Sequence, residues 1–489
     1  MQLELKVVTP ENNGIVGREY EQNLIWEYYN TPKAELVAIY GRRRVGKTFL
    51  IRQCLGEKID FYFMGSFETP RSVQLMLFKT ELQRCSGQKR LKPKNWFEAF
   101  EQLREYLSSL NQEKKVVFLD ELPWMDTPKS SFLQAFSYFW NSWASTVAGL
   151  KIYVCGSATI WMLSNLIGDR GGLHGRVSRS IYLSPFSLGE TESFLQRKGI
   201  EWNRCQISEA YMIMGGVAYY LDMLQSDLTF GENIDNLFFR EGAPLRTEYD
   251  FIFRSLFKDA SLYGKVVETL SKKAVGMTRQ NIIEELGIED NGLISEVLDN
   301  LCKCDFIRQY SSIGKKSRDC MYQLVDLFSL FHLHFVADSN GQDEHFWSNV
   351  SESQMRKSWQ GHAFEQVCLH HIPQIKAKLG ISGVLSNVYS WSCKAFTDSD
   401  GTQWKGNQID LLIDRHDETI NICEMKFSVA PYTIDADYDE RLRSRTEAFR
   451  RITGTRKALH RTMITTYGIV KNKYSGNVNQ IVTINDLFG

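Results

Sequence analysis

Between Glu35 and about Pro185, short apolar runs alternate with longer amphipathic stretches. Short runs of this kind are typical of buried strands, and the stretches between them have the spacing of amphipathic helices. The alternation predicts an α/β fold in which helices cover the faces of a mostly parallel sheet. The expected strands lie in ELVAIY (35–40), KIDFYFMG (58–65), KKVVFLD (114–120), KIYVCG (151–156) and RSIYLSP (179–185).

From Leu188 to about Asp250 the pattern is helical and contains few strand-like runs. It opens with SLGETESFLQRKGI, in which Ser187 is followed three residues later by Glu190. This spacing is the capping-box pattern of a helix start. Gly215 and Gly216 indicate a turn between helices. We expect a small helical lid in this part of the chain.

Three helical stretches and a strand pair follow between Ser261 and Val336. In the third stretch, Leu293, Val297 and Leu301 fall on one helical face, with Ile294 and Leu298 beside them. Three helices and a hairpin in this order predict a winged helix-turn-helix. The segments are YGKVVETLSKK (263–273), TRQNIIEELGI (278–288), NGLISEVLDNLCKCDFI (291–307) and the hairpin FIRQYSSIGKKSRDCMYQLV (306–325).

The helix that would recognise DNA in such a fold is acidic. Acidic side chains repel phosphates, which disfavours major-groove recognition and favours a structural or regulatory role. The expected wing is basic and is a candidate contact with a nucleic-acid backbone. The acidic residues are Glu289, Asp290, Glu296 and Asp299 against Lys303, and the wing carries Lys315, Lys316 and Arg318.

The last part of the chain, from about Gln354, begins with a helical stretch (GHAFEQVCLHHIPQI) and continues with strand pairs around NQIDLLID and ETINICEMKF. It closes with a helix, a strand and a turn. The pattern of the whole chain divides it into four predicted domains. They are a parallel-sheet core (1–187), a helical lid (188–255), a winged helix (256–338) and a C-terminal α/β domain (345–489).

Composition narrows the functional classes. The chain has 489 residues, and its 58 Lys and Arg are balanced by 58 Asp and Glu, so any nucleic-acid contact must use a local patch. The ten cysteines form no CxxC pair, which favours buried, reduced thiols. The start of the chain lacks the pattern of a signal peptide, and no apolar run approaches the roughly 20 residues that cross a bilayer. We therefore expect a cytoplasmic protein that makes no membrane contact.

The clearest chemical motif follows the first expected strand. Residues 41–48 match GxxxxGK[ST] and lead into a helix. Glycines let backbone N–H groups curl around phosphate oxygens, and the helix start adds free donors. Lys47 would reach the β- and γ-phosphates, and the Thr48 hydroxyl would bind Mg²⁺. The expected binding residues are Gly41, Arg42, Arg43, Arg44, Val45, Gly46, Lys47, Thr48 and Phe49.

An acidic pair ends another expected strand, in KKVVFLDELPWMD. Asp120 would hold Mg²⁺, and Glu121 would polarise the attacking water. The alternative is an acidic turn after a buried strand. Because this pair accompanies a phosphate loop, we predict hydrolysis of a nucleoside triphosphate.

Polar residues after the later strands complete the predicted site. Ser157, at the end of KIYVCG, is a candidate sensor of the γ-phosphate, with a turn serine as the alternative. Arg176 is our candidate to stabilise transition-state charge, and Arg170 and Arg179 are nearby alternatives. If Arg176 acts on a neighbouring subunit, the protein is a homo-oligomer.

Five segments in this order resemble the archaeal-type ATPase family, a prokaryotic branch of the P-loop ATPases related to AAA+ and STAND NTPases. They are IVGREYE, YGRRRVGKT, VVFLDELPWMD, CGSAT and LHGRVSRSIYLSPFS. The resemblance covers about half of the chain and implies ATP rather than GTP, with Glu121 as the catalytic base. Members often have a proline where this chain has Ala218, which puts the local form of the lid turn in doubt.

The C-terminal domain carries a set of acidic residues and a lysine. Asp410 lies in one expected strand, and Glu424 and Lys426 project from the same face of the next. Glu365 lies on the preceding helix. The set resembles the D…ExK arrangement of the PD-(D/E)XK nuclease superfamily, although the usual proline before the aspartate is missing. The resemblance implies Mg²⁺ bound by Asp410 and Glu424, with Lys426 beside the attacking water. The alternative is a solvated ion pair without metal or cleavage.

A basic stretch after these residues is a candidate nucleic-acid contact, since basic side chains hold phosphate backbones. A solvated helix face is the alternative, and Asp435, Asp437, Asp439 and Glu440 just before it would neutralise part of its charge. The ten basic residues are Arg441, Arg443, Arg445, Arg450, Arg451, Arg456, Lys457, Arg461, Lys471 and Lys473.

Two histidines near this domain, His370 and His371, have no further ligand at metal-binding spacing and are interpreted as helix surface. Three functions remain for the chain. One is an ATPase coupled to a nuclease-like domain that acts on nucleic acid. Another is an ATP-dependent switch or scaffold whose nuclease-like domain binds a partner without cutting. The third, a winged-helix transcription regulator, is disfavoured by the acidic recognition helix.

Overall fold

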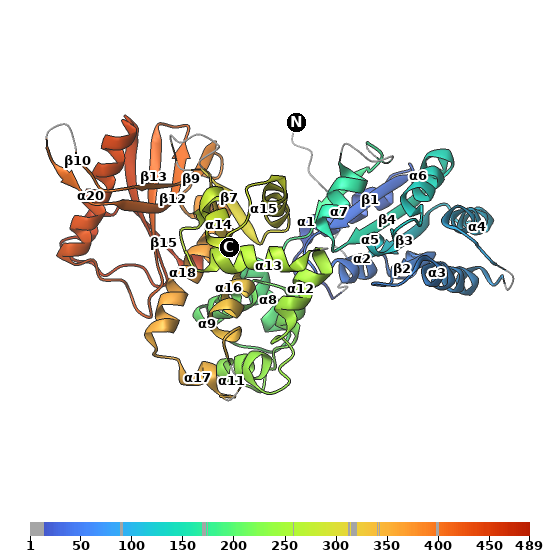
Figure 1. Ribbon diagram of the computed structural model, residues 1–489, viewed down its shortest axis with the longest axis horizontal. Helices are drawn as coiled ribbons and strands as arrows, with labels where there is room; N and C mark the ends of the chain where they lie inside the picture. The colour runs from blue at the N-terminus through green and yellow to red at the C-terminus, as the bar shows by residue number, and fades with distance from the viewer. Residues whose placement is uncertain are drawn as a thin grey trace. The chain divides into compact units, whose positions relative to one another are not determined.

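The computed structural model describes residues 14–88, 91–168, 173, 175–257, 259–311, 313, 320–339, 341, 343–397 and 401–489 (Figure 1). The chain forms two compact units, Met1–Pro185 and Phe186–Gly489. Among the described residues, no helix has both the length and the apolar character needed to cross a membrane.

A five-stranded parallel sheet forms the centre of the first unit, in the order β2-β3-β4-β1-β5. The α/β fold class is therefore confirmed, and all five expected strands are present. Because the strands are parallel, their carboxyl ends share one edge of the sheet, where the phosphate loop and the acidic pair follow β1 and β3. The strands are β1 (Glu35–Tyr40), β2 (Phe61–Met64), β3 (Lys115–Asp120), β4 (Leu150–Gly156) and β5 (Arg179–Tyr182).

Helices cover both faces of this sheet, so each strand buries side chains on two sides. On β1, Leu36 and Ala38 pack in one core with α3, α4 and α6, whereas Val37 and Ile39 pack in the other with α1 and α2. The alternation of β1 side chains thus joins the two helical layers to the strand that carries the phosphate loop. The helices are α1 (Glu19–Asn30), α2 (Lys47–Leu55), α3 (Arg71–Ser86), α4 (Trp96–Ser109), α5 (Leu122–Met125), α6 (Phe132–Ser142) and α7 (Thr159–Trp161).

The second unit begins with the predicted helical stretch. Ser187 and Glu190 form a capping box at the start of α8, as the sequence predicts. The turn at Gly215 and Gly216 has left-handed backbone, and a Cβ at Gly216 would lie 2.3 Å from the carbonyl oxygen of Phe186, which requires glycine there. The helices are α8 (Leu188–Arg197), α9 (Arg204–Met214), α10 (Ala218–Asp222), α11 (Phe230–Ile234), η4 (Asp235–Phe239) and α12 (Glu248–Leu256).

Residues 260–324, which the sequence predicts to form a winged helix and which we call the winged-helix segment for that prediction, contain the expected helices and an antiparallel sheet of order β6-β8-β7. On α15, Val297 and Leu301 are buried together with Ile294 and Leu298 beside them, whereas Leu293 near the start of the helix is exposed. The predicted wing contacts Lys315, Lys316 and Arg318 lie outside the described residues. The elements are α13 (Ala260–Ser271), β6 (Met277–Thr278), α14 (Arg279–Leu286), α15 (Gly292–Lys303), β7 (Ile307–Tyr310) and β8 (Met321–Leu324).

An aromatic core joins the next helices. The rings of Trp347 and Trp359 meet edge to face at 5.6 Å, and Phe331 and Phe335 contact both. The prediction that His371 lies on a helix surface is wrong, because its ring is buried and its Nε2 accepts a hydrogen bond of 3.0 Å from the Leu188 N–H. The helices are α16 (Leu327–Phe331), η6 (His332–Val336), α17 (Phe346–Asn349), α18 (Gln354–His370) and α19 (Ile372–Lys378).

Residues 354–489, which the sequence predicts to be nuclease-like and which we call the nuclease-like segment for that prediction, contain a second five-stranded sheet of order β15-β14-β13-β12-β9. Strands β9, β12 and β13 are antiparallel, while β13, β14 and β15 are parallel. Helix α20 (Ala436–Thr453) connects the parallel pair β13 and β14. The strands are β9 (Ser386–Cys393), β12 (Asn407–Arg415), β13 (Thr419–Lys426), β14 (Ala458–Thr465) and β15 (Gln480–Thr483), and β10 (Phe396–Thr397) pairs with β11 (Gln403–Trp404).

Candidate functional site

The phosphate loop turns directly from β1 into α2, and its backbone explains its glycines. Gly41 has φ +145°, and a Cβ there would lie 2.3 Å from the carbonyl oxygen of Leu183, so only glycine fits. Gly46 has φ +97° and precedes the first residue of α2. Arg44 is also left-handed, with φ +71°. These turns fold the loop over the start of α2, where free N–H groups favour an anion.

Lys47 is buried beneath this loop. Its side-chain amine donates hydrogen bonds to the carbonyl oxygens of Gly41 (3.0 Å) and Arg42 (2.8 Å). Burial lowers the pKa of the amine, and the negative charge of Glu121 opposes that shift. A phosphate oxygen would offer the amine a charged acceptor in place of the two carbonyls. The position therefore suits a cation that binds a phosphate group.

Asp120 and Thr48, the two predicted Mg²⁺ ligands of the first unit, lie together. The Thr48 hydroxyl donates a hydrogen bond of 3.1 Å to Oδ1 of Asp120. Asp120 is fully buried at the end of β3, and its Oδ1 faces the Thr48 hydroxyl at the start of α2. A hydroxyl and a carboxylate on neighbouring elements are oxygen donors of the kind that Mg²⁺ prefers. The residues present therefore fit that metal.

Two partners of Asp120 were missed from the sequence. The Tyr62 hydroxyl donates to Oδ2 at 3.1 Å, and the Cys155 thiol donates to Oδ1 at 2.6 Å. Burial raises the pKa of Cys155, and the charge of Asp120 adds to that effect, so the thiol keeps its proton. The sequence feature that could have identified Cys155 is its position two residues before Ser157. Both residues lie near the end of β4, which pairs with β3.

Glu121, the predicted base, is held in a specific orientation. Its backbone is left-handed, with φ +47°, at the turn between β3 and α5. Its Oε2 accepts two hydrogen bonds from Ser157, one from the backbone N–H and one from the hydroxyl, each of 2.9 Å. The structure thus places Ser157 on the predicted base, whereas its predicted contact with a γ-phosphate stays a prediction.

The remaining predicted residues of the first site differ in how far they are buried. Arg42 and Val45 are buried, and Arg43 is half-buried. Phe49 is 51 % exposed on α2. Arg176 is exposed in the turn before β5, where its backbone N–H donates to the carbonyl oxygen of Leu173. The contribution of Arg176 to a nucleotide site therefore stays a prediction.

Of the two alternatives to Arg176, Arg179 lies among the described residues. The guanidinium of Arg179 donates a hydrogen bond of 2.8 Å to the hydroxyl of Tyr20 on α1. That contact uses one of its nitrogens as a structural link between β5 and α1. Arg170 lies outside the described residues.

In the second unit, Glu365, Asp410 and Glu424 form what we call the carboxylate cluster. They come from α18, β12 and β13, and β12 and β13 are antiparallel neighbours. Burial raises the pKa of Glu365 to about 8, and the charge of Asp410 adds to that rise. Burial also raises the pKa of Asp410, with a further contribution from Glu424. The tertiary structure therefore brings the predicted acidic residues close enough to interact.

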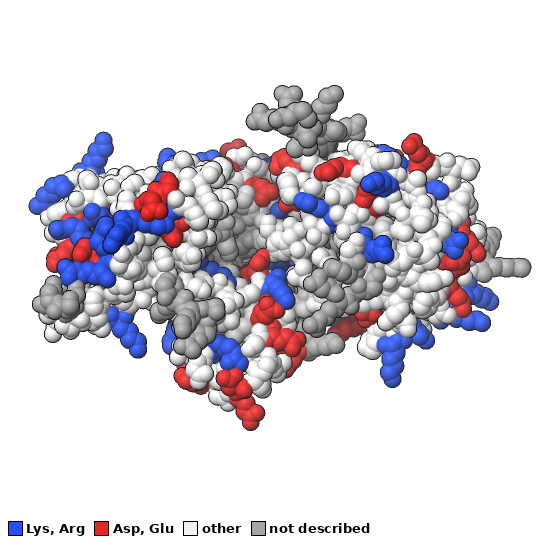
Figure 2. Space-filling model, turned by 90° about the horizontal axis from the view of Figure 1, so that it is seen from above, with Lys and Arg blue, Asp and Glu red and all other residues white. Residues whose placement is uncertain are grey.

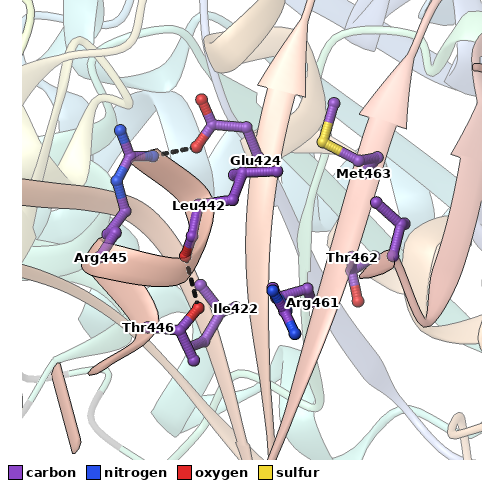
Figure 3. A pocket seen from close by; sticks show the side chains of 9 residues that line it. Ile422, Glu424, Leu442, Arg445, Thr446, Arg461, Thr462 and Met463 are labelled. Atoms are coloured by element: carbon purple, nitrogen blue, oxygen red, sulfur yellow. Dashed lines mark hydrogen bonds and ion pairs between the residues drawn. The ribbon is translucent and has the colours of Figure 1, made fainter. Parts of the chain in front are cut away.

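Cations and a phenol occupy both oxygens of Glu424. Oε1 accepts from the Tyr438 hydroxyl at 2.8 Å and pairs with the Lys426 amine at 3.0 Å. Oε2 pairs with the guanidinium of Arg445 on α20, as Figure 3 shows. Burial alone would raise the pKa of Glu424, but Lys426 and Arg445 outweigh it and keep the carboxylate ionised.

This arrangement does not fit a bound Mg²⁺. A divalent cation needs negative charge at its ligands, and the charges of Lys426 and Arg445 already neutralise Glu424, whose further partner is the Tyr438 hydroxyl. In the part of the chain that the structure describes, no group of three or more His, Cys, Asp and Glu side chains is arranged to hold a metal ion. The cavity beside Glu424 and Arg445 has a volume of about 10 Å³, which is room for about one water molecule.

The basic stretch is partly neutralised by acidic neighbours. Figure 2 shows Lys and Arg side chains intermixed with Asp and Glu at the end of the second unit that carries α20. Arg445 was counted with this stretch in the sequence, but its pairing with Glu424 directs it into the carboxylate cluster. Three further pairs are Arg443 with Asp439 (2.9 Å), Arg451 with Glu447 (3.1 Å) and Lys457 with Asp414 (2.7 Å).

The first site lies in a segment that matches a known family of ATPase domains. Residues 15–224 match the model of a family described as an ATPase domain predominantly from Archaea. The matched segment contains the phosphate loop, Asp120, Glu121, Ser157 and Arg176. The match supports ATP binding and hydrolysis by this part of the chain.

The individual relatives have low sequence identity to this chain or match only a short stretch of it. Over 418 residues the chain is 22 % identical to an uncharacterized protein (MJECL04) of Methanocaldococcus jannaschii. This alignment covers 84 % of this chain and 87 % of the relative. A stretch of 43 residues is 46 % identical to an uncharacterized ATP-binding protein (MJ0423) of the same organism. This shorter alignment covers 9 % of this chain and 73 % of that protein. A solved structure of a Walker-type ATPase of Pyrococcus abyssi is 18 % identical, covers 66 % of this chain and 97 % of its own, and has a TM-score of 0.46.

Proposed function

We propose that the first unit binds ATP with Mg²⁺ and hydrolyses it. The observation that carries this proposal is the hydrogen bond between Thr48 and Asp120, which joins the end of the phosphate loop to the acidic end of β3. Lys47 lies beneath the same loop, and Glu121 follows Asp120 directly. A phosphate-binding amine, two metal-binding oxygens and an adjacent carboxylate are the groups that this reaction needs.

Each residue has a distinct proposed role. The loop N–H groups and Lys47 bind and orient the β- and γ-phosphates. Thr48 and Asp120 hold Mg²⁺, which withdraws charge from the phosphate oxygens when it is bound. Glu121 accepts a proton from the attacking water, in the orientation that Ser157 maintains. Arg176, from the same or a neighbouring subunit, supplies positive charge to the transition state.

The test of this proposal is binding and turnover of ATP by the full chain. Lys47→Ala removes the buried amine, and we expect loss of fluorescent ATP-analogue binding together with loss of phosphate release. Arg84→Ala is the matched control, since Arg84 forms an exposed pair with Glu81 on α3. If the folded wild-type protein fails to bind adenine nucleotide at millimolar concentration, the proposal is wrong.

For the nuclease-like segment we propose two candidate roles. The first is Mg²⁺-dependent action on nucleic acid by Glu365, Asp410, Glu424 and Lys426. The second is that of a switch or scaffold that binds a partner without cutting. One observation favours the second role: Lys426, Arg445 and Tyr438 occupy both oxygens of Glu424. The first role requires a rearrangement that releases these oxygens.

A cleavage assay separates the two roles. Labelled single- and double-stranded DNA and RNA are incubated with the wild-type chain, Asp410→Ala and Lys426→Ala in Mg²⁺ or Mn²⁺. Cleavage that both substitutions abolish would support the nuclease. Binding to the same nucleic acids without cleavage would support a scaffold, and the basic residues of α20 are then the contacts to be tested.

A further inference from the structure

Asp120, the proposed Mg²⁺ ligand at the end of β3, receives hydrogen bonds on both of its side-chain oxygens. Oδ1 accepts from the Cys155 thiol (2.6 Å), the Thr48 hydroxyl (3.1 Å) and the backbone N–H of Glu121 (2.9 Å). Oδ2 accepts from the Tyr62 hydroxyl at 3.1 Å. Thr48 and Glu121 already have proposed roles in ATP hydrolysis, whereas Cys155 and Tyr62 have none.

Strand pairing brings the Cys155 thiol to the carboxylate. Leu119 of β3 pairs with Val154 of β4, so the next residues along the two parallel strands, Asp120 and Cys155, are neighbours. Phe118 and Cys155 pack in the same core, and Asp120, two residues after Phe118, faces the same side of the sheet. The contact between thiol and carboxylate therefore follows from the register of two central strands.

The Tyr62 ring is held by two further contacts. Tyr62 on β2 pairs in register with Phe118 on β3, and the centres of their rings lie 5.3 Å apart. The guanidinium of Arg52 on α2 lies 5.2 Å from the centre of the Tyr62 ring. Because these contacts restrict the ring, its hydroxyl has little conformational freedom to lose when it bonds to Asp120.

The donors to Asp120 are neutral groups: two hydroxyls, a thiol and an amide. The amine of Lys47 donates instead to carbonyl oxygens of the phosphate loop. Neutral donors orient a carboxylate without cancelling its charge, and a divalent cation binds where that charge remains. Glu424 has the opposite surroundings, since Lys426 and Arg445 both pair with it. Asp120 is therefore both oriented and free to give its charge to a metal.

We propose that Tyr62 and Cys155 are positioning residues, which hold the Asp120 carboxylate in the orientation that binds Mg²⁺ beside Thr48. The inference rests on the proposed binding of ATP with Mg²⁺ by the first unit and adds two residues to it. Cys155 bonds to one carboxylate oxygen and Tyr62 to the other, so together they oppose rotation of the group. Loss of either donor lets the carboxylate turn away from the metal, which weakens metal binding.

The test measures the affinity of the full chain for Mn²⁺ in complex with a fluorescent, non-hydrolysable ATP analogue. The protein is in excess over the analogue, and electron paramagnetic resonance follows the free ion. We expect Tyr62→Phe and Cys155→Ala each to weaken Mn²⁺ binding about tenfold. Binding of the analogue in EDTA should stay close to that of the wild type. In an Asp120→Asn background, neither substitution should weaken Mn²⁺ binding further, because both act through that carboxylate.

Two further variants separate positioning from general stability. Tyr153→Phe is the matched control, since its buried hydroxyl donates to the carbonyl oxygen of Ile25 at 2.9 Å in the same core. It should lower stability in urea without changing Mn²⁺ affinity, and an equal loss of affinity there would contradict a specific role for Tyr62. Cys155→Ser keeps a donor and should recover most of the affinity that Cys155→Ala loses. Affinity no better than that of Cys155→Ala would contradict the role of the thiol hydrogen bond.

Tyr62→Phe decides the outcome if Cys155→Ala does not yield folded protein, because it removes a single oxygen from a half-buried ring. Unchanged Mn²⁺ affinity in folded Tyr62→Phe would overturn the positioning role. If the wild type binds the analogue and Mn²⁺ while the variants bind both equally well, ATP binding stands and positioning is contradicted. If the folded wild type binds no analogue, with or without metal, the proposed function itself is contradicted.

Discussion

Ser157 fixes the side chain of Glu121 through two hydrogen bonds of 2.9 Å to the same carboxylate oxygen, Oε2. One comes from the backbone N–H at the end of β4 and the other from the hydroxyl. Glu121 itself follows β3, so the contact joins the ends of two neighbouring strands. The orientation of the proposed base therefore depends on a residue 36 positions away in the chain.

Ser157→Ala should slow ATP turnover while leaving nucleotide binding almost unchanged. The substitution removes the hydroxyl donor to a charged oxygen but keeps the backbone donor. Loss of one such bond is worth about 1.4 kcal/mol, which corresponds to a fall in kcat of about tenfold. Steady-state kinetics separate kcat from KM, with Ser109→Ala on α4 as the control. A rise in KM at constant kcat would instead point to a role in binding ATP.

Glu121→Gln should bind ATP like the wild type and hydrolyse it at least about 100-fold more slowly, since the amide cannot accept the proton of the attacking water. The amide oxygen can still accept the Ser157 bonds, so the turn after β3 should persist. Binding of a fluorescent ATP analogue and phosphate release would be measured on one sample. Turnover at the wild-type rate would exclude Glu121 as the base.

Arg445→Gln should destabilise the second unit more than Arg451→Gln on the same helix. The pair of Arg445 with Glu424 is largely buried, with side chains 22 % and 12 % exposed, whereas Arg451 and Glu447 are 38 % and 46 % exposed. Removal of Arg445 leaves Oε2 of Glu424 without its cation while Lys426 still pairs with Oε1, at a cost of about 2 kcal/mol, against about 0.5 kcal/mol for the exposed pair. Urea denaturation would compare both variants, and equal effects would contradict a buried role for Arg445.

Glu365 should make the second unit less stable as the pH rises. Its pKa is about 8 in the folded chain and close to 4.5 when unfolded, so between these values the folded state binds the extra proton. The contribution of Glu365 to the free energy of unfolding is therefore greatest below about pH 4.5 and decreases as the pH rises toward 8. Glu365→Gln keeps the side chain neutral, so its advantage over the wild type should grow across this window. Urea denaturation in the presence of EDTA, at several pH values, would measure the difference, and a constant difference would contradict the raised pKa.

Features formed by consecutive residues were predictable from the sequence. The phosphate loop is a run of eight positions between a strand and a helix, and both elements are present where the pattern places them. Asp120 ends β3 because an apolar run of strand length stops at the acidic pair. The capping box at Ser187 and Glu190 is equally local. In these cases the backbone geometry depends on neighbours within one turn or strand.

Contacts between distant segments were decided by the tertiary structure. Tyr62 and Cys155 reach Asp120 only because β2 and β4 flank β3 in the sheet. His371 was predicted to lie on a helix surface, yet its docking on Leu188 buries it. Strand order and helix docking follow from the packing of whole surfaces, which the local pattern of polar and apolar residues does not specify.

The C-terminal acidic residues illustrate both sides of this division. Their spacing on paired strands was enough to predict that Asp410, Glu424 and Lys426 share one region of a sheet. The sequence could not indicate that Arg445 would turn from a basic helix face toward Glu424. Which cation faces Glu424 depends on how α20 packs in three dimensions, because charge pairing acts through space and not along the chain.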